Sequence, residues 1–386
     1  MKPQKDYSSI RGVCHNSRAG TEEYLREIGY ARSIGVNSFR TWLSYRGWQR
    51  NRDAFIENIR GFIRTAYENG ITVMPIIFNG NGLDPETLSL EWRTDVGDIY
   101  VRDLVTSLKD EPGIIMWDIM NEPSCNDYIM KCSREEREVR WAQMNENLRH
   151  YCDLVKDLDP DGTITIGHTY AGDLLPSAEW VDVISFHDYL ESESRIEHTY
   201  EVAEEIANKY SKPLINSELS CLGRANPYEQ SIKAARDHKV GFYVFELMIR
   251  GYWGDIHGIF YPDGTVRDPS TVTAMMGIYR NYSSTRIKPN PNKEGKADEA
   301  LARLSRAMSD SAEVFHHKKA SSDEILEAAE WIINLLEGSE LVPMYDPPRV
   351  KLYRYRATPE SERDLDEIKD FAYALAETLR RACRIM

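Results

Sequence analysis

Residues 10–41 of this 386-residue chain, IRGVCHNSRAGTEEYLREIGYARSIGVNSFRT, contain a complete strand–helix–strand unit. A short apolar run, Ile10 to Cys14, is followed by an amphipathic segment, Thr21 to Ser33, and by a second short run, Asn37 to Thr41. Gly35 stands between the predicted helix and the second run, where a glycine in the left-handed conformation commonly ends a helix. The stretch is therefore typical of a βαβ unit, in which the two strands are parallel.

The same alternation of short β-branched runs and longer amphipathic segments continues to about residue 282. It predicts eight strands: Ile10 to Cys14, Asn37 to Thr41, Thr72 to Phe78, Ile114 to Ile119, Thr163 to Gly167, Val181 to Phe186, Pro213 to Ser217 and Gly241 to Phe245. The predicted helices are Thr21 to Ser33, Arg52 to Asn69, Val96 to Leu108, Glu135 to Leu158, Glu193 to Tyr210, Pro227 to His238 and Ser270 to Tyr282.

Eight β/α units indicate an α/β fold, and the residues after the first predicted strand favour one of its two common forms. Gly12 to Ser17 read GVCHNS and contain no glycine-rich phosphate-binding turn, which disfavours a doubly wound nucleotide-binding sheet. We therefore predict a (β/α)₈ TIM barrel, which needs roughly 250 residues. Because the chain is longer than that, a second structural unit is expected.

This second unit is predicted to be a small C-terminal helical extension. The expected boundaries are 1–282 for the barrel, 283–296 for a polar, proline-containing linker and 297–386 for the helical module. Apolar spacing within the module predicts helices over Ala297 to Phe315 and Asp323 to Leu336, an extended piece over Val342 to Tyr355, and a last helix from about Pro359 to Met386. The module is expected to pack either on the barrel or on a partner subunit. In the second case, the protein would be a homo-oligomer.

Composition limits the classes of partner. The formal net charge is -14, and the basic residues are dispersed among more numerous acids, so we expect neither nucleic acid nor a membrane as a partner. A neutral substrate fits better. The segment Met1 to Ile10 is polar and no apolar run of about 18 residues occurs, which predicts a cytoplasmic protein, or a secreted one if a signal peptide has been removed. The six cysteines show no zinc spacing, so reduced and buried thiols are expected.

Two glutamates follow predicted strands on opposite sides of the barrel. Glu122 comes directly after the fourth strand and Glu218 directly after the seventh. In a parallel barrel the carboxyl ends of the strands form the active-site face, so both side chains are expected at one mouth. Two carboxyl groups converging on a cleft are what cleavage of a glycosidic bond needs, because one protonates the leaving oxygen and the other attacks the anomeric carbon or activates water.

At this point the sequence resembles a known family. Asn121-Glu122-Pro123 after an apolar strand, Ser185-Phe186-His187-Asp188-Tyr189 after another, and Glu218 after a third resemble the cellulase-like clan A of glycoside hydrolases, near family 5. The resemblance covers residues from about 8 to 282. It implies a retaining β-glycoside hydrolase that acts on a β-linked oligosaccharide or polysaccharide, with Glu122 as acid/base and Glu218 as nucleophile.

The resemblance also implies the neighbours of the two glutamates. Asn121 corresponds to the residue that binds the sugar 2-hydroxyl, and Arg40 corresponds to the arginine beside the nucleophile. His187 and Tyr189 match residues that touch the acid/base and the nucleophile, respectively. Asp118, inside the fourth strand, is expected to be structural.

The chemistry of the two carboxyl groups agrees with these roles. Glu122 must be protonated near neutral pH to act as an acid, which requires a raised pKa, whereas Glu218 must be ionised, which a nearby Arg40 and the Tyr189 hydroxyl would favour. Double displacement further requires the two carboxyl groups to lie roughly 5–5.5 Å apart.

The sequence departs from the family pattern at two strand ends. Asn79 stands at the third, where the family often has His, and is a candidate ligand for a sugar hydroxyl. Glu246 stands at the eighth, where a Trp usually forms the floor of the sugar site, so Trp253 or Trp48 would have to supply that platform. Glu246 either binds sugar hydroxyls or forms a salt bridge with Arg250, and both interpretations stay open at this point.

Two other function classes compete with the glycosidase. The first is a metal-dependent barrel sugar isomerase or hydrolase with Glu122, His187, Glu218 and Glu246 as ligands, although no His-x-His pair follows the first strand. The second is a carbohydrate-binding barrel that has lost catalysis. On the leading hypothesis we expect no metal and no cofactor.

Overall fold

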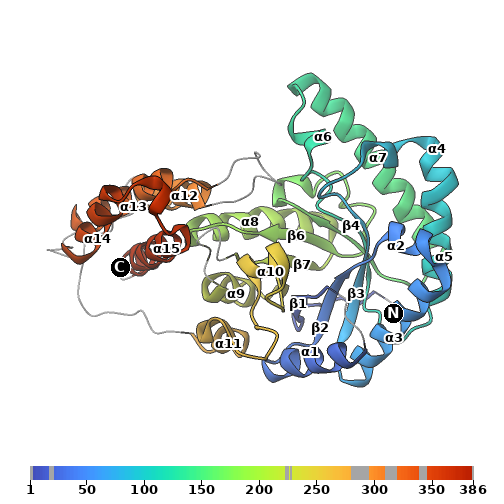
Figure 1. Ribbon diagram of the computed structural model, residues 1–386. Helices are drawn as coiled ribbons and strands as arrows, with labels where there is room; N and C mark the ends of the chain where they lie inside the picture. The colour runs from blue at the N-terminus through green and yellow to red at the C-terminus, as the bar shows by residue number, and fades with distance from the viewer. Residues whose placement is uncertain are drawn as a thin grey trace.

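The chain folds, in a computed structural model, into a closed barrel of eight parallel strands (Figure 1), as predicted. The structure describes residues 3–16, 21–221, 226, 228–279, 295–308, 320–338 and 346–384. The strands follow one another around the barrel in chain order, and β8 closes it by pairing with β1. They are β1 (Arg11–Cys14), β2 (Ser38–Trp42), β3 (Thr72–Asn79), β4 (Trp117–Asn121), β5 (Ile164–His168), β6 (Ile184–Asp188), β7 (Leu214–Leu219) and β8 (Gly241–Val244).

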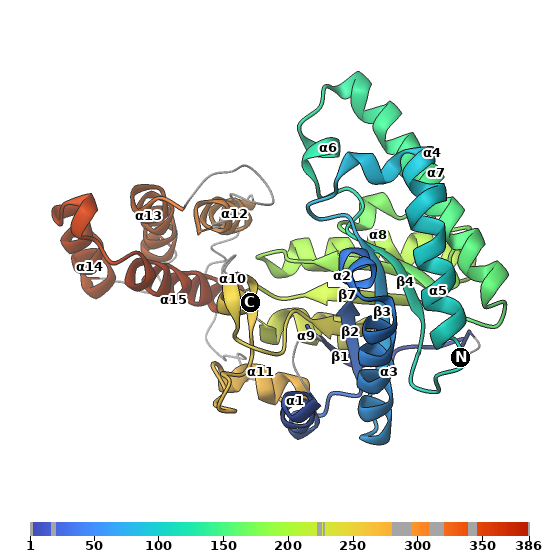
Figure 2. The same ribbon diagram turned by 45° about the vertical axis from the view of Figure 1, so that its right-hand side comes forward.

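Helices surround the barrel and extend beyond one end of it (Figure 2). Those between β1 and β4 are α1 (Thr21–Ser33), α2 (Tyr45–Arg50), α3 (Arg52–Glu68), η1 (Pro85–Leu88), α4 (Leu90–Trp92), the π-helix η2 (Arg93–Gly97) and α5 (Asp98–Leu108). Those that follow are α6 (Asp127–Met130), α7 (Arg134–Leu158), η3 (Ala171–Asp173), α8 (Glu193–Tyr210), α9 (Tyr228–Asp237), α10 (Gly251–His257) and α11 (Pro269–Met275). Among the described helices, none is long and apolar enough to cross a membrane.

Local sequence explains where several helices begin and end. α7 begins after Ser133, whose hydroxyl accepts from the Glu136 amide while the Glu136 carboxylate accepts from the Ser133 amide, a capping box. α11 ends earlier than the predicted Tyr282 because Gly277 adopts a left-handed conformation, with φ of 79°, after the last helical turn. A glycine there satisfies the last carbonyls without the steric cost that other residues would meet.

The barrel has two apolar layers. The inner one fills the barrel and includes Cys14, Met74, Val183, Ile215 and Tyr243. The outer one lies between the strands and the surrounding helices, as at Phe62 of α3, which is fully buried. The register of the sheet shifts where β4, β6 and β7 approach their ends, and such bulges redirect the side chains that follow them.

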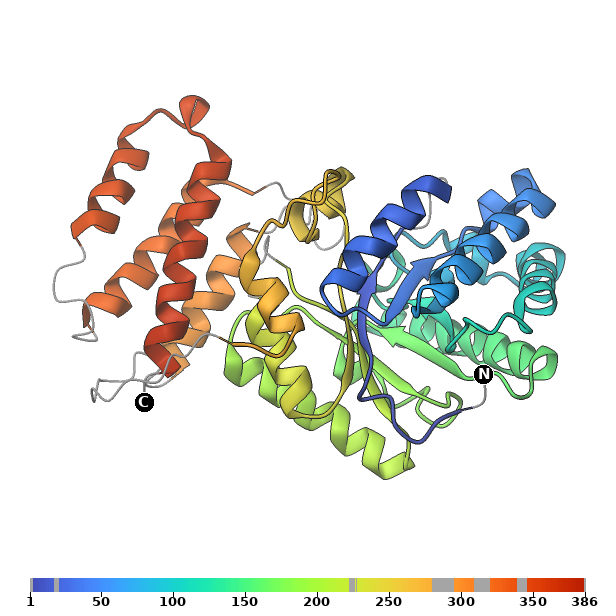
Figure 3. The same cartoon turned by 90° about the horizontal axis from the view of Figure 1, so that it is seen from below.

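The C-terminal helices have a hydrophobic core of their own and stand together on one side of the barrel (Figure 3). They are α12 (Lys296–Met308), α13 (Ser322–Gly338), α14 (Asp346–Ala357), the 3₁₀ helix η7 (Glu360–Glu362) and α15 (Leu365–Arg384). The predicted boundary and most of the predicted linker fall in 280–294, and the predicted end of the first module helix falls in 309–319; both ranges lie outside the described residues. The predicted homo-oligomer stays a prediction.

One prediction in this module is wrong: the piece over Val342 to Tyr355 is not extended. From Asp346 onward it is helix α14, which buries Leu352 and Tyr355 against the module core. Pro347 and Pro348 do not prevent this helix, because proline is tolerated in a first helical turn, where its missing N–H would have had no partner. The final helix also begins later than predicted, at Leu365, because the Asp364 carboxylate accepts from the first free amides of α15.

Candidate active site

A pocket of about 850 Å³ opens at the carboxyl ends of the strands. Six acidic residues line it, and three of them, Glu122, Glu218 and Glu246, stand at the ends of barrel strands. Each of these three lies within two residues of the last residue of its strand, which is where the active sites of such barrels lie. The pocket is also lined by aromatic side chains, namely Trp42, Tyr45, Phe78, Trp92, Tyr151, Tyr189, Phe245, Tyr252 and Trp253.

Glu122 is almost fully buried and its backbone is tightly constrained. Its φ of 47° lies in the left-handed region that non-glycine residues rarely adopt, which is characteristic of functional sites. Its amide donates to the Gly167 carbonyl at 2.7 Å. Gly80 packs so closely that a Cβ there would meet the Glu122 carbonyl oxygen at 2.4 Å, so the glycine is required. The side chain is therefore presented to the pocket from a fixed point.

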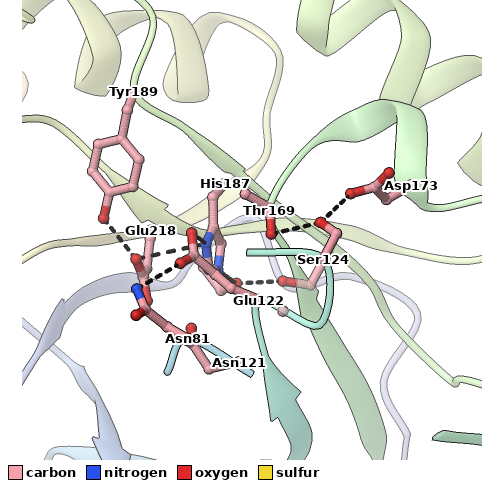
Figure 4. A network of polar contacts seen from close by, with 12 residues as sticks. Asn81, Asn121, Glu122, Ser124, Thr169, Asp173, His187, Tyr189 and Glu218 are labelled. Atoms are coloured by element: carbon pink, nitrogen blue, oxygen red, sulfur yellow. Dashed lines mark hydrogen bonds and ion pairs between the residues drawn. The ribbon is translucent and has the colours of Figure 1, made fainter. Parts of the chain in front are cut away.

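Glu218 is held by two donors, one of which, the Tyr189 hydroxyl, can be seen in Figure 4. The Tyr189 hydroxyl donates to its Oε2 at 2.6 Å, and a guanidinium nitrogen of Arg40 donates to its Oε1. Burial and the nearby Glu218 raise the pKa of Tyr189, so its hydroxyl remains a donor at any working pH. The structure thus brings Arg40 and Tyr189 together on Glu218.

Arg40 acts from beneath the pocket, because it is fully buried and does not line the pocket wall. It donates to Asp118 Oδ2 through Nε at 2.9 Å and Nη2 at 2.8 Å, and Nη2 also donates to Asn121 Oδ1 at 2.8 Å. Burial lowers the pKa of Arg40, but the carboxylates of Asp118 and Glu218 outweigh it and raise that pKa. Asp118, predicted to be structural, is the counter-ion that fixes this cation under Glu218.

His187 joins Glu122 to a chain of two serine hydroxyls. Its Nδ1 lies 2.9 Å from Glu122 Oε1, and its Nε2 lies 3.1 Å from the Ser217 hydroxyl, which accepts from Ser185 at 2.6 Å. Because Ser217 accepts from Ser185, its own proton points to His187 Nε2, and the ring must then donate from Nδ1 to Glu122. Burial lowers the pKa of His187 to about 4, so the ring is neutral near pH 7.

An amide chain lines the pocket opposite the histidine. Asn121 donates through Nδ2 to Asn79 Oδ1 at 2.9 Å, and Asn79 donates to the Asn81 carbonyl at 2.8 Å. Asn81 in turn donates to Glu122 Oε2 at 3.5 Å. The sequence did not single out Asn81 as a ligand, although the glycines on both sides of it indicate a tight turn at the rim. Asn147 and Tyr151 of α7 also line the pocket without having been predicted.

Glu246 lines the pocket with 9% of its surface exposed. Its predicted alternative as the partner of Arg250 is wrong, because Arg250 pairs instead with Glu23, at 2.5 Å, and with Glu27. Among the described residues, no hydrogen bond or ion pair to the Glu246 carboxyl group is recorded. Burial, and then the charge of Glu218, raise the pKa of Glu246 to about 8.

The two candidate aromatic platforms differ in position. Trp253 lines the pocket beside Phe245, with their ring centroids 6.5 Å apart. Trp48 does not line it: the ring is buried in the core and its Nε1 donates to Asp103 at 2.6 Å. Its ring packs beside Tyr100 of α5, with ring centroids 5.5 Å apart, so Trp48 is excluded as the platform.

Glu122, His187 and Glu218 are also the group of described residues whose geometry comes nearest to a metal site, with one donor atom of each within 4.8 Å of the others. A divalent cation there would meet the guanidinium of Arg40, which already occupies Glu218 Oε1. His187 would also have to give up its hydrogen bond to Glu122. The electrostatics of these residues therefore disfavour a metal.

Comparisons with known proteins agree with this fold. The family model described as cellulase (glycosyl hydrolase family 5) matches residues 8–223. The GH5_18 protein from Streptomyces cattleya, solved in complex with Manb1-4GlcNAc, superposes with a TM-score of 0.57 at 15% identity, over 77% of this chain and 92% of that one.

Two further solved structures share the fold. The endo-1,4-beta-mannanase from Rhizomucor miehei has a TM-score of 0.55 at 15% identity, over 69% of this chain and 92% of that one. An endoglucanase from Pseudomonas stutzeri has a TM-score of 0.53 at 16% identity, over 68% and 87%. No curated protein sequence matches this chain.

Proposed function

This chain belongs to the cellulase family, glycosyl hydrolase family 5, and is a glycosidase, and we propose that it cleaves a β-linked oligosaccharide or polysaccharide with retention of configuration. Glu122 is the acid/base and Glu218 the nucleophile. The observation that carries the proposal is the distance between them: an oxygen of each carboxyl group lies within 4.8 Å of the other. Retaining enzymes need about 5–5.5 Å, whereas inverting ones need about 6.5–9.5 Å to admit a water molecule.

The surroundings of the two glutamates support different roles for them. Glu218 receives donors from a fixed cation, Arg40, and from Tyr189, which stabilise a carboxylate poised to attack. Glu122 is contacted by the neutral His187 ring at Oε1 and by the Asn81 amide at Oε2. Both of these partners are neutral, whereas Glu218 receives a hydrogen bond from a cation, so the negative charge is stabilised more at Glu218, and we assign to Glu122 the proton that passes to the leaving group.

The reaction then takes two steps. In the first, Glu218 attacks the anomeric carbon while Glu122 gives its proton to the glycosidic oxygen, which leaves as an alcohol. In the second, Glu122 takes a proton from water as that water attacks the glycosyl–Glu218 ester and releases the sugar. We assign Asn121 and Asn79 to sugar hydroxyls, Trp253 to stacking on a sugar face, and Glu246 to the same subsite.

A panel of β-linked aryl glycosides and oligosaccharides tests the proposal, with the first-formed anomer followed by NMR. We expect turnover of at least one β-glycoside and a product that appears first as the β-anomer. Initial appearance of the α-anomer would refute retention. No turnover of any member would favour the carbohydrate-binding barrel, and loss of activity in a chelator with recovery on adding a divalent cation would favour the metal-dependent alternative.

The raised pKa of Glu246 predicts how activity responds to alkaline pH. Its pKa of about 8 leaves it protonated near pH 7, so it can donate to one sugar hydroxyl and accept from another. As the pH rises above 8, Glu246 ionises and places a second negative charge beside Glu218, so kcat/KM should fall by about tenfold between pH 7 and pH 9. Glu246→Gln keeps a neutral donor and acceptor, so its decline over this range should be clearly smaller than that of wild type.

Two groups in electrostatic contact with Glu246, Cys14 and Tyr228, do not titrate in this window. Burial raises the pKa of Cys14 and of Tyr228 well above its ordinary value, so both remain neutral at pH 9. Glu138→Gln, which removes an exposed carboxylate on α7, serves as a control and should keep the wild-type profile. If Glu246→Gln showed the same alkaline decline as wild type, the decline would belong to another group.

A further inference from the structure

The segment that carries Tyr189 is held along its backbone. It connects β6 to α8 and begins with Tyr189, whose hydroxyl reaches Glu218. The Leu190 amide donates to Asp188 Oδ1 at 3.0 Å, and the Leu190 carbonyl accepts from the Asn226 side chain. The position of the Tyr189 hydroxyl therefore depends on how firmly this short segment is fixed.

The next carbonyl in the segment, that of Glu191, is bound by the C-terminal module. Arg380 of α15 donates to it through Nε at 2.6 Å, across 189 residues of sequence. Arg380 is 4% exposed and Glu191 3% exposed, so the contact is enclosed between module and barrel. Glu191 pairs its own carboxylate with Arg195, which leaves the backbone oxygen as the atom that Arg380 binds.

A buried guanidinium is costly unless it is hydrogen-bonded, so this contact is unlike a chance approach of two surfaces. Arg380 also approaches Glu377 of the same helix at 3.3 Å, which supplies a counter-charge. A second module contact lies close by, where Ser194 of α8 donates to Asp298 of α12 at 2.7 Å. Two helices of the module thus contact the same short stretch of the barrel (Figure 3).

We propose that Arg380 is a positioning residue for the reaction, which fixes the Glu191 backbone and thereby keeps the Tyr189 hydroxyl on Glu218. On this view the C-terminal module completes the active site of the barrel. The proposal rests on the proposed role of Glu218 as nucleophile. It predicts that the effect of Arg380 on turnover passes through Tyr189.

The test is a double-mutant cycle on kcat. Arg380→Gln should lower kcat by about tenfold with little change in KM, the loss expected for one hydrogen bond to a charged group. Tyr189→Phe should lower kcat as well, and in the Tyr189→Phe background Arg380→Gln should have little further effect. Arg380→Lys, which keeps a donor, should recover most of the activity.

The control is Arg381→Gln, which removes an exposed guanidinium from the same helix and should leave kcat unchanged. Equal effects of Arg380→Gln with and without the Tyr189 hydroxyl would overturn the proposal, as would a lowered melting temperature with wild-type kcat. If Arg380→Gln does not fold, Arg380→Met, which keeps the apolar stem of the side chain and removes the donor, provides the same cycle in both backgrounds. If the wild-type protein turned over no glycoside, the proposed function itself would be wrong, whereas the outcomes above concern only the coupling of Arg380 to Tyr189.

Discussion

Glu218→Ala is expected to lower kcat on any glycoside substrate by about 10⁴-fold or more, because it removes the group that forms the covalent intermediate. The fold should survive the substitution. Arg40 keeps its two hydrogen bonds to Asp118 and one to Asn121, so the buried guanidinium retains its counter-ion when Glu218 is shortened. Steady-state kinetics, with a thermal melt and circular dichroism as the folding control, measure both parts.

Addition of azide distinguishes loss of a nucleophile from other kinds of damage. The cavity left by Glu218→Ala admits a small anion next to Arg40 and Tyr189, and attack from that side gives the α-glycosyl azide from a β-glycoside. We expect partial recovery of turnover with this inverted product. Glu246→Ala also shortens a pocket carboxyl group and should show no such recovery. A Glu218→Ala variant with near-wild-type kcat would exclude Glu218 as the nucleophile.

The fold could be predicted from periodicity because each barrel strand is short, apolar and followed by an amphipathic helix. All eight strands lie within a few residues of their predicted positions, and α1 and α8 have the predicted bounds. The errors at strand starts have a common cause. In β4 and β6 the apolar sequence begins several residues before the strand, since Ile114 and Val181 are buried in the approach to the barrel. Hydrophobicity reports burial there and not a continuous ladder, since Ile114 forms only an isolated bridge with Val73.

The site was predictable to the extent that it follows strand ends. Glu122, Glu218 and Glu246 could be placed at one mouth because each follows a strand, and parallel strands of a barrel share that face. What sequence could not supply is the depth of each side chain. Arg40 lies beneath Glu218 and not in the pocket wall, and Asp118, whose pattern indicates only a buried position in β4, turns out to be its counter-ion.

The residues that sequence missed act through long-range contacts. Asn81 reaches Glu122 from the turn after β3, and Arg380 reaches Glu191 across 189 positions. No local pattern marks such contacts, because they depend on how separate elements pack. The bulges in β4, β6 and β7 are a further example, since they redirect the residues that follow them and cannot be read from a period-two pattern.

Glu122→Ala should affect substrates according to their leaving groups. A glycosidic alcohol or a weakly acidic phenol needs a proton to depart, so kcat/KM for such substrates should fall by about 10²–10⁴-fold, the usual contribution of general acid catalysis. A dinitrophenyl glycoside leaves without protonation, and its kcat/KM should remain close to wild type. Water then lacks its general base in the second step, so the glycosyl–Glu218 ester should accumulate.

Three measurements test this prediction. A burst of dinitrophenol equal to the enzyme concentration should precede a slow steady state, and mass spectrometry of a peptic digest should find the sugar on the peptide that contains Glu218. Azide should speed the second step and give the β-glycosyl azide, opposite in configuration to the product of Glu218→Ala with azide. Because one anion yields two anomers from two variants of the same pocket, the stereochemistry assigns the roles without reference to rate. An equal loss of kcat/KM for both kinds of leaving group, or the same azide anomer from both variants, would contradict the assignment of Glu122 as the acid/base.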